Sequence, residues 1–438
     1  MDAKALIEEI RTEKRNAVAS GILREEKPLA VITDKEKPRE LPEGWQWCRL
    51  GDYAMKVTDY VASGSFASLK ENVLITNEEN YAVMVKTADF SNGFTKNLTY
   101  TDEHGYKFLE NSNLYGGELI LSNIGSIGKV FIVPDLHRPM TLASNTVMIR
   151  MTHNEYNKYM YYMFLSPFGQ KLLMSISSGT SMLKFNKSQL KSTVIPVAPL
   201  EQQFQICNTL DRVQKIITHR KAELEKLDDL IKARFVEMFG TIHDNKFAYR
   251  IMTIQDVCEP IKDGTHQTPE YTNDDENGFK FLSSKDVTSG KIDWNHLKYI
   301  PEKLHKELYS RIAPRRGDLL LAKNGTTGIA AIVDRDEVFD IYVSLALLRP
   351  TIVDSIYLWG AINSTETKEQ FDASLKGIGV PNLHLGEIKK TRIIVPPIEK
   401  QQEYATFVSQ IDKSKSVIQK SLDETRLLFD SLMQKYFG

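Results

Sequence analysis

The sequence predicts a mixed α–β protein of the α+β type, with two tandem pseudo-symmetric domains joined and spaced by an antiparallel pair of long coiled-coil helices. Three observations predict this fold class. The two halves of the chain repeat each other, each half contains short apolar runs bounded by turn residues, and each half closes on a long heptad pattern. The chain has 438 residues, of which 42% are hydrophobic and 26% charged, so it can bury large cores.

The internal repeat is visible in two pairs of segments. GELILSNIGSIGKVFIV at 117–133 corresponds to GDLLLAKNGTTGIAAIV at 317–333, and LKSTVIPVAPLEQQ at 190–203 corresponds to IKKTRIIVPPIEKQ at 388–401. The copies lie about 200 residues apart in both pairs, which indicates a tandem duplication after an N-terminal extension. A single active site rarely needs such a duplication, whereas a pseudo-symmetric binding protein often does.

The repeat divides the chain into five expected segments. They are a helical extension at 1–40, a first mixed domain at 41–198, a central long helix at 199–240, a second mixed domain at 241–396 and a C-terminal long helix at 397–438. The extension has weak apolar spacing at Leu6, Ile7, Ile10, Val18 and Ile22. We expect it to dock on the paired helices or on a partner.

The mixed domains contain both strand and helix signals. Apolar runs at Glu118–Ser122, Lys129–Val133 and Thr146–Arg150 are bounded by Gly, Asn, Ser and Pro and predict strands. Helices are expected over Asn157–Met174 and Ile356–Leu375. The Tyr and Met residues at 156–163 could form a base-stacking surface, but their helical spacing favours core packing.

The long helices follow Pro199 and Pro397. Apolar residues recur at alternating spacings of four and three over about five heptads in each, a pattern that favours coiled-coil pairing. Polar Arg234 and Lys415 at the seam should lie near Glu403 and near Glu223, Glu225 or Asp229, respectively. The alternative is two independent amphipathic helices, each packed on its own domain. The expected pairing residues are Leu210, Val213, Ile217, Leu224, Leu227 and Ile231 in the first helix and Val408, Ile411, Ile418, Leu422, Phe429 and Leu432 in the second.

Composition excludes several classes of protein. Lys plus Arg number 56 and Asp plus Glu 57, so the net charge of −1 excludes coating of polyanions by bulk charge but permits a local basic face. Three scattered cysteines provide neither a disulfide framework nor a zinc motif, which favours the cytoplasm. The sequence has no apolar run long enough for a membrane helix, so we expect no membrane contact.

Motifs for catalysis are also absent from the sequence. Gly125–Val130 lacks the spacing and hydroxyl of a phosphate-binding P-loop, and Gly377–Gly379 stops short of a dinucleotide fingerprint. Pro396-Pro397 lies between Val395 and Ile398, without the acidic or Asn residue and the aromatic residue that hold a flipped adenine. We therefore expect the chain alone to catalyse nothing and to bind no metal or cofactor.

Several segments resemble the specificity (S) subunits of type I restriction–modification systems. IPVAPLEQQFQI at 195–206, IVPPIEKQQEY at 394–404 and the two glycine-containing repeats are similar to that family's conserved regions and late recognition-domain segments. LPEGWQWCRLGDYA at 41–54 resembles the start of a first recognition domain. DGTHQTPEY at 263–271 and FLSSKDVTSGKIDW at 281–294 resemble one common type of recognition domain. The resemblance covers nearly all of residues 41–438, and order and duplication make it specific.

The resemblance implies a non-catalytic DNA-recognition subunit. It would read a bipartite, asymmetric target in double-stranded DNA, one half-site per domain, and its helices would hold the domains apart and dock two methyltransferase (modification) subunits. Up to two motor-nuclease (restriction) subunits would join. S-adenosylmethionine, ATP and Mg are expected on those partners. Two alternatives remain: the recognition scaffold of a methylation-only or phage-exclusion complex, and a stand-alone DNA methyltransferase or nuclease with an unrecognised site.

Polar loops of both domains supply the candidate DNA contacts. Base readout and phosphate contact use Arg, Lys, Asn, Gln, Ser and Thr side chains. The alternative is that these loops are ordinary turns without a DNA contact, and that His266 forms a hydrogen bond that only stabilises the fold. The candidates are Ser63, Ser65, Asn123, Ser126, Lys129, Ser178, Thr180, Ser181, Lys184, Asn186 and Lys187 in the first domain and Lys262, Thr265, His266, Gln267, Thr268, Tyr271, Lys285, Lys323, Asn324 and Thr326 in the second.

Overall fold

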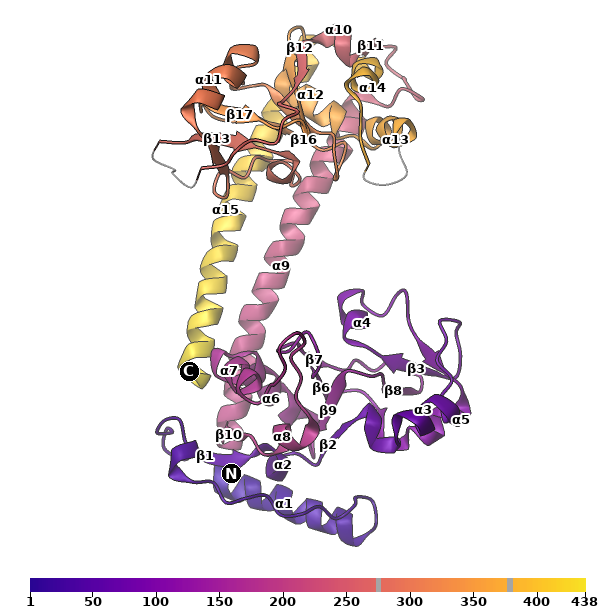
Figure 1. Cartoon of the computed structure of the whole chain (residues 1–438), viewed down its shortest axis with the longest axis vertical. Helices are drawn as coiled ribbons and strands as arrows, with labels where there is room; N and C mark the ends of the chain where they lie inside the picture. Colours follow the sequence, from indigo (N-terminus) through magenta and orange to yellow (C-terminus); the bar gives the residue numbers. More distant parts are fainter. Residues whose placement is uncertain (273–276, 376–380) are drawn as a thin grey trace. The chain divides into compact units, whose positions relative to one another are not determined.

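The computed structural model describes residues 1–272, 277–375 and 381–438. It divides into two compact units. Unit 1 comprises Met1–Thr218 with Asp423–Gly438, and unit 2 comprises His219–Leu422. Each unit is mixed α–β and each contains parts of both long helices (Figure 1). The predicted fold class is therefore confirmed.

Unit 1 contains two four-stranded sheets and a separate strand pair. The first sheet has the antiparallel order β2-β9-β6-β7, and the second has the order β4-β3-β8-β5 with β3 and β8 parallel. The pair joins β1 to β10, with Gln46 opposite Val197. The strands are β1 (Gln46–Arg49), β2 (Lys56–Asp59), β3 (Ala82–Val85), β4 (Tyr100–Thr101), β5 (Asn113–Leu114), β6 (Leu119–Ser122), β7 (Val130–Ile132), β8 (Met140–Leu142), β9 (Thr146–Arg150) and β10 (Val194–Val197).

Unit 2 repeats this plan, with three strands in its second sheet among the residues that the structure describes. The first sheet has the order β12-β18-β15-β16, the second β14-β13-β17, and β11 pairs with β19. Arg250 lies opposite Val395, the register of the first pair. The strands are β11 (Arg250–Thr253), β12 (Cys258–Asp263), β13 (Phe279–Leu282), β14 (Lys298–Ile300), β15 (Leu319–Ala322), β16 (Ala330–Ile332), β17 (Phe339–Ile341), β18 (Leu345–Pro350) and β19 (Arg392–Val395).

Shorter helices cover the sheets of each unit. In unit 1 they are α1 (Ala3–Ala19), α2 (Leu50–Tyr53), α3 (Phe66–Asn72), α4 (Thr87–Ser91), α5 (Glu103–Phe108), α6 (Asn154–Leu165), α7 (Pro167–Ser175) and α8 (Lys187–Lys191). In unit 2 they are α10 (Ile254–Val257), α11 (Glu302–Arg311), α12 (Ser355–Ile362), α13 (Thr365–Ser374) and α14 (Leu385–Lys390). Short 3₁₀ turns form at Asp34–Glu36, Tyr60–Ser63, Glu110–Ser112 and Ser284–Asp286.

Two helices predicted as single are each divided in two. Ser166 ends α6 and caps α7, because its hydroxyl accepts a hydrogen bond from Gly169 N and Pro167 occupies the first turn, where no backbone donor is needed. Ser364 begins α13 in the same way, with its hydroxyl accepting from Thr367 N. In both cases the Ser cap overrides an apolar pattern that runs through the break.

The two long helices are uninterrupted. They are α9 (Leu200–Phe239) and α15 (Ile398–Phe437), drawn as continuous ribbons in Figure 1. In unit 1 the start of α9 shares a core with the end of α15, through Leu210 and Phe437 among others. In unit 2 the end of α9 packs on the start of α15, through Phe235 and Tyr404. The helices are therefore antiparallel.

All twelve predicted pairing positions are at least half-buried. The buried ones are Leu210, Val213, Ile217, Ile231, Val408 and Leu422, and the half-buried ones are Leu224, Leu227, Ile411, Ile418, Phe429 and Leu432. Half-burial is what a two-helix seam provides, because only one partner covers each side chain.

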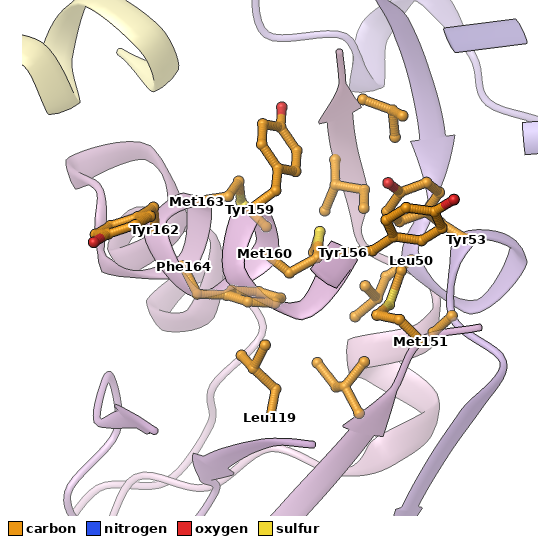
Figure 2. Packing of buried hydrophobic residues seen from close by; sticks show 14 of the residues in the cluster. Leu50, Tyr53, Leu119, Met151, Tyr156, Tyr159, Met160, Tyr162, Met163 and Phe164 are labelled. Atoms are coloured by element: carbon orange, nitrogen blue, oxygen red, sulfur yellow. The ribbon is translucent and has the colours of Figure 1, made fainter. Parts of the chain in front are cut away.

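The Tyr and Met residues of α6 form the core of unit 1, as the helical spacing predicted. Figure 2 shows Tyr156, Tyr159, Met160 and Met163 packed among Leu50, Leu119 and neighbouring apolar side chains. Tyr159 is fully buried, and its hydroxyl donates to the carbonyl of Pro196 at 3.0 Å. The surface available for base stacking therefore does not include this helix face.

The N-terminal extension packs on unit 1. Leu6, Ile7 and Ile10 of α1 are buried in the core of that unit, beside α2 (Figure 1). Ile22 is 77% exposed, so the apolar spacing that continued beyond Val18 does not mark a buried face. The extension thus completes the first domain.

Candidate nucleic-acid interface

In unit 1 the structure brings two of the predicted loops together. Ile124, in the loop after β6, forms a bridge with Lys184, and Gly125 N donates to the carbonyl of Leu183 at 2.9 Å. Asn123 anchors the same contact, because its Nδ2 donates to Phe185 O at 3.1 Å. Residues 122–129 and 178–187 are therefore joined into one loop surface.

A half-buried ion pair fixes the base of this surface. Lys187 Nζ lies 2.9 Å from Asp59 Oδ1, at the end of β2, and the Asp59 side chain is 12% exposed. The chain then continues through the 3₁₀ turn to Ser63 and Ser65, where the Ser65 hydroxyl accepts from Ser68 N and caps α3. Ser63 is the last residue of this turn, and Ser65 lies beyond it at the start of α3.

In unit 2 three predicted segments converge. Lys323 Nζ lies 2.9 Å from Asp263 Oδ2, which joins the loop after β15 to the loop after β12. Ser344 links these loops to the third segment, since its carbonyl accepts from Lys323 N and its hydroxyl accepts from Ser284 N, both at 2.9 Å. His266 Nε2 also lies 3.3 Å from Asp263.

The glycine of the DGT sequence at 263–265, at the start of this loop, is required for steric reasons. A Cβ on Gly264 would lie 1.9 Å from the carbonyl oxygen of Ile341, so only glycine permits this approach of two backbones. The approach aligns Thr265 with Tyr342 in a parallel bridge. The exposed residues that follow, His266 to Thr268, are thereby held on a rigid base.

A cavity of about 310 Å³ lies under the same loop. Lys262, Thr265, Arg311 and Asp340 are among its lining residues, and Lys262 Nζ donates to Arg311 O at 3.1 Å. Asp340 is 1% exposed, and His305 Nδ1 lies 2.7 Å from its Oδ2. Burial raises the pKa of Asp340 to about 6, while the hydrogen bond to His305 opposes that shift.

Exposure separates the candidate DNA contacts into three groups. Those open to solvent are Ser65, Ser126, Lys129, Ser178, Thr180, Ser181, Lys184, Asn186, Lys262, His266, Gln267, Thr268, Tyr271, Lys285 and Thr326. Half-buried are Ser63, Lys187 and Asn324. Asn123, Thr265 and Lys323 are buried, and their hydrogen bonds and ion pairs hold the loops in place.

Sequence reasoning missed the carboxylates that organise both surfaces. Asp59 and Asp263 occupy corresponding positions at the ends of β2 and β12, and each holds a lysine. Neither is among the candidate DNA contacts, because those contacts are expected from Arg, Lys, Asn, Gln, Ser and Thr side chains. The available signal was the repeat itself, since aligning LGD at 50–52 with IQD at 254–256 also aligns Asp59 with Asp263.

The described residues contain neither a metal-binding cluster nor a membrane-spanning helix. Within residues 1–272, 277–375 and 381–438, no three His, Cys, Asp or Glu side chains gather closely enough to hold a metal ion. No helix in the described part of the chain is long and apolar enough to cross a membrane.

Comparison with known proteins places the chain in a family. The model of the type I restriction modification DNA specificity domain matches it twice, over residues 42–226 and 248–425. The chain belongs to this family. The two matches coincide with the duplication read from the sequence, so the resemblance to S subunits is confirmed, and DNA-target recognition is the role of this family.

Individual S subunits are similar to the chain over most of its length. The type I restriction enzyme MjaVIII specificity subunit of Methanocaldococcus jannaschii is 23% identical over 85% of this chain and 87% of its own. The EcoBI specificity subunit of Escherichia coli is 24% identical over 68% and 69%, respectively.

Solved structures share the fold. The S subunit of a type I restriction–modification system from M. genitalium has a TM-score of 0.50 at 15% identity and covers 91% of this chain and 98% of its own. A structure described as the structural basis of complex assembly and conformational transition of the type I R-M system has a TM-score of 0.54 at 18% identity, with coverages of 91% and 99%.

Proposed function

We propose that this chain is the specificity subunit of a type I restriction–modification complex, which recognises a bipartite, asymmetric DNA target and positions methyltransferase and restriction subunits on it. The observation that carries the proposal is the duplication of the recognition domain, each copy with its own set of polar loops on a rigid base. The loops differ in sequence between the copies, so each copy would read a different half-site.

The exposed loop residues would make the DNA contacts. In unit 1, Lys129 and Lys184 stand on the joined surface of residues 122–129 and 178–187 and suit phosphate oxygens. In unit 2, His266, Gln267 and Thr268 project beyond the fixed Gly264 turn and suit base edges. Asp59 and Asp263 would act through the lysines that they position.

The outer faces of the long helices would dock two modification subunits. Val417, Leu427 and Leu428 on α15 are 71%, 69% and 51% exposed, and they lie off the seam that pairs the helices. Exposed leucine and valine side chains on a long helix are typical of a surface that another protein covers. Up to two restriction subunits would then join.

Chemistry would reside on those partners in the cytoplasm. The methyltransferase subunits would hold S-adenosylmethionine and transfer its methyl group to adenine, and the motor-nuclease subunits would use ATP and Mg. This chain would contribute binding and orientation and no reacting group.

Reconstitution tests the proposal. The chain is combined with the modification subunit and S-adenosylmethionine, and methylated adenines are mapped on a randomised DNA library. We expect two short fixed sequences separated by an unread spacer, with no methylation by the chain alone. Methylation by the isolated chain would instead support the alternative of a stand-alone enzyme. A complex that methylates but never cleaves with a restriction subunit would support the methylation-only scaffold.

Single substitutions test the two kinds of contact. Lys184→Ala should weaken binding to all sequences and reduce the slope of log affinity against log salt by about 0.9. Lys171→Ala, an exposed lysine on α7, is the matched control and should leave the slope unchanged. Gln267→Ala should relax the sequence preference of one half-site only.

A further inference from the structure

The two units differ in what covers one corresponding face. In unit 1 the face consists of the β1–β10 pair and α2, and the N-terminal extension packs on it. α1 contacts both β1 and α2, and Leu6 and Ile10 join the same core as Trp45 and Cys48. In unit 2 the β11–β19 pair and α10 form the corresponding face, hereafter the uncovered face.

The uncovered face has kept its apolar character. The shared register of the strand pairs makes Tyr249, Met252 and Val395 the counterparts of Trp45, Cys48 and Val197. The three residues in unit 1 are buried, whereas their counterparts are half-buried. Ile398, which is 42% exposed, extends the face; its counterpart Leu200 donates its backbone N–H to the carbonyl of Met1 in unit 1. No segment among residues 1–272, 277–375 and 381–438 takes the place of α1 on it.

The charged residues of unit 1 that form ion pairs with the N-terminal extension also have counterparts in unit 2. Arg11 Nη2 lies 2.9 Å from Asp52 Oδ2, and Lys191 Nζ lies 2.5 Å from Glu26 Oε1, in the segment that follows α1. The counterparts in unit 2 are Asp256 and Lys389. Asp256 is exposed and uses Oδ2 for its bonds to Thr253, which caps α10.

The face therefore offers an apolar strip between an acidic and a basic group. A helix that fits it needs apolar side chains spaced like Leu6, Ile7 and Ile10, a basic residue about one turn later for Asp256, and an acidic residue further on for Lys389. The α1 helix of a second copy is a poor occupant, because Ala3 and Leu6 are 0% exposed in their own unit and release would open that core.

We propose that the uncovered face of unit 2 docks one amphipathic helix of a modification subunit, with this apolar spacing and this order of charges. The inference rests on the proposed function, since it names a second contact site for a partner assigned there. It also implies that the two modification subunits are held differently, because α1 occupies the corresponding face of unit 1.

Hydrogen exchange on the assembled complex tests this site. Exchange of the full chain is measured alone and with two equivalents of the modification subunit, while sedimentation reports whether the complex forms. We expect peptides covering 247–256 and 392–399 to exchange at least about tenfold more slowly in the complex. A complex that forms with unchanged exchange in these peptides overturns the inference and leaves the proposed function standing. Absence of any complex overturns both.

Two variants test the chemistry of the site. Asp256→Asn keeps an oxygen for the Thr253 cap but removes the charge, and we expect about tenfold weaker binding of one of the two modification subunits. Ile398→Ser, an exposed position at the start of α15, should act in the same direction. Asp336→Asn is the control, because that carboxylate is 82% exposed and lies outside the face. Equal binding by Asp256→Asn and Asp336→Asn would overturn the proposed occupant.

Discussion

Arg234 lies 3.5 Å from Glu403, Nη2 to Oε1, between the end of α9 and the start of α15 within unit 2. The heptad register predicted this contact between residues far apart in the sequence. The second predicted contact was wrong in its partner, since Lys415 pairs with Asp228 and not with Glu223, Glu225 or Asp229. A long side chain beside the seam can reach either of two adjacent residues on the facing helix. The heptad register therefore predicts which turn of the facing helix it meets, but not which residue it pairs with.

The two ion pairs should contribute unequally to stability. Arg234 has partners besides Glu403, since it also lies 2.8 Å from Glu237 and over the ring of Phe407. We therefore expect Glu403→Ala to change stability little. Lys415 is only 16% exposed, so Asp228→Ala should cost about 1–2 kcal/mol by leaving a half-buried ammonium without its carboxylate.

Denaturant unfolding of the full-length variants measures the difference. Asp229→Ala is the matched control for Asp228→Ala, since the Asp229 carboxylate is 76% exposed and pairs along the same helix with Lys232. A loss of stability in Glu403→Ala equal to that in Asp228→Ala would contradict the assignment.

The three cysteines should be unreactive in the folded chain. Cys48, Cys207 and Cys258 are free and buried, and burial raises the pKa of each thiol to about 12. At pH 8 the thiolate is then rarer by about three orders of magnitude than in an ordinary thiol. Alkylation by iodoacetamide, followed by mass spectrometry, should label none of them in buffer and all three in denaturant. Rapid labelling of any one without denaturant would argue against its burial.

A pH-dependent contribution should come from Asp340. Its folded pKa of about 6 lies above the unfolded value of about 3.9, so the folded state binds the proton more tightly. The contribution of this group to the free energy of unfolding should fall as pH rises from about 4 to about 6, and it should stay flat below that window.

Comparison with Asp340→Asn isolates this contribution. The advantage of the native chain over the variant should shrink by about 1–3 kcal/mol between pH 4 and pH 6.5. Asp336→Asn, at an exposed carboxylate, serves as the control and should show no such trend. A stability difference that is independent of pH would show that folding does not raise the pKa of Asp340.

The elements predicted well from the sequence were those with a long regular pattern of buried apolar residues or with a copy in the other half of the chain. Heptad burial predicted both long helices, and the repeat predicted that each half carries the same sheet plan. The repeat also aligns pairs that only the structure reveals, such as Glu118 with Arg150 at 2.8 Å and Asp318 with Arg349 at 2.7 Å. These acids could have been found as matching residues, because each lies between a Gly and the first residue of the corresponding strand, β6 or β15.

The parts predicted poorly depend on contacts between loops. Neither the role of Ser344 in joining three segments nor the pairing of Lys187 with Asp59 has a local sequence signal, because each depends on loops about 20 to 130 residues apart that tertiary packing brings together. The docking of α1 on unit 1 was missed for a similar reason. The short apolar stripe of α1 could pack on many different surfaces, and the stripe itself does not indicate which of them it contacts.

Exchange of recognition domains should alter one half of the target. If residues 41–198 are replaced by the corresponding domain of another family member, with α9 and α15 retained, the variant should keep the half-site read by unit 2 and the original spacer. Methylated-adenine mapping measures both halves. The reciprocal exchange of residues 241–396 is the matched control. A change in both halves after either exchange would show that the domains do not read separately.

The long helices should set the length of the unread spacer. α9 has 40 residues, about 60 Å at 1.5 Å per residue, and the pairs Arg234–Glu403 and Asp228–Lys415 place Lys221 about opposite Gln419. Four residues inserted at both positions add about 6 Å, or one to two base pairs at about 3.4 Å each.

A seven-residue insertion at the same two positions is the sharper variant. It keeps the heptad phase, whereas four residues locally unwind the supercoil. It adds about 10 Å and should favour a spacer longer by about three base pairs with both half-sites unchanged. Target mapping decides between the outcomes. Full activity on the original spacer would show that the helices do not measure the distance, and altered half-sites would show that they take part in reading the sequence.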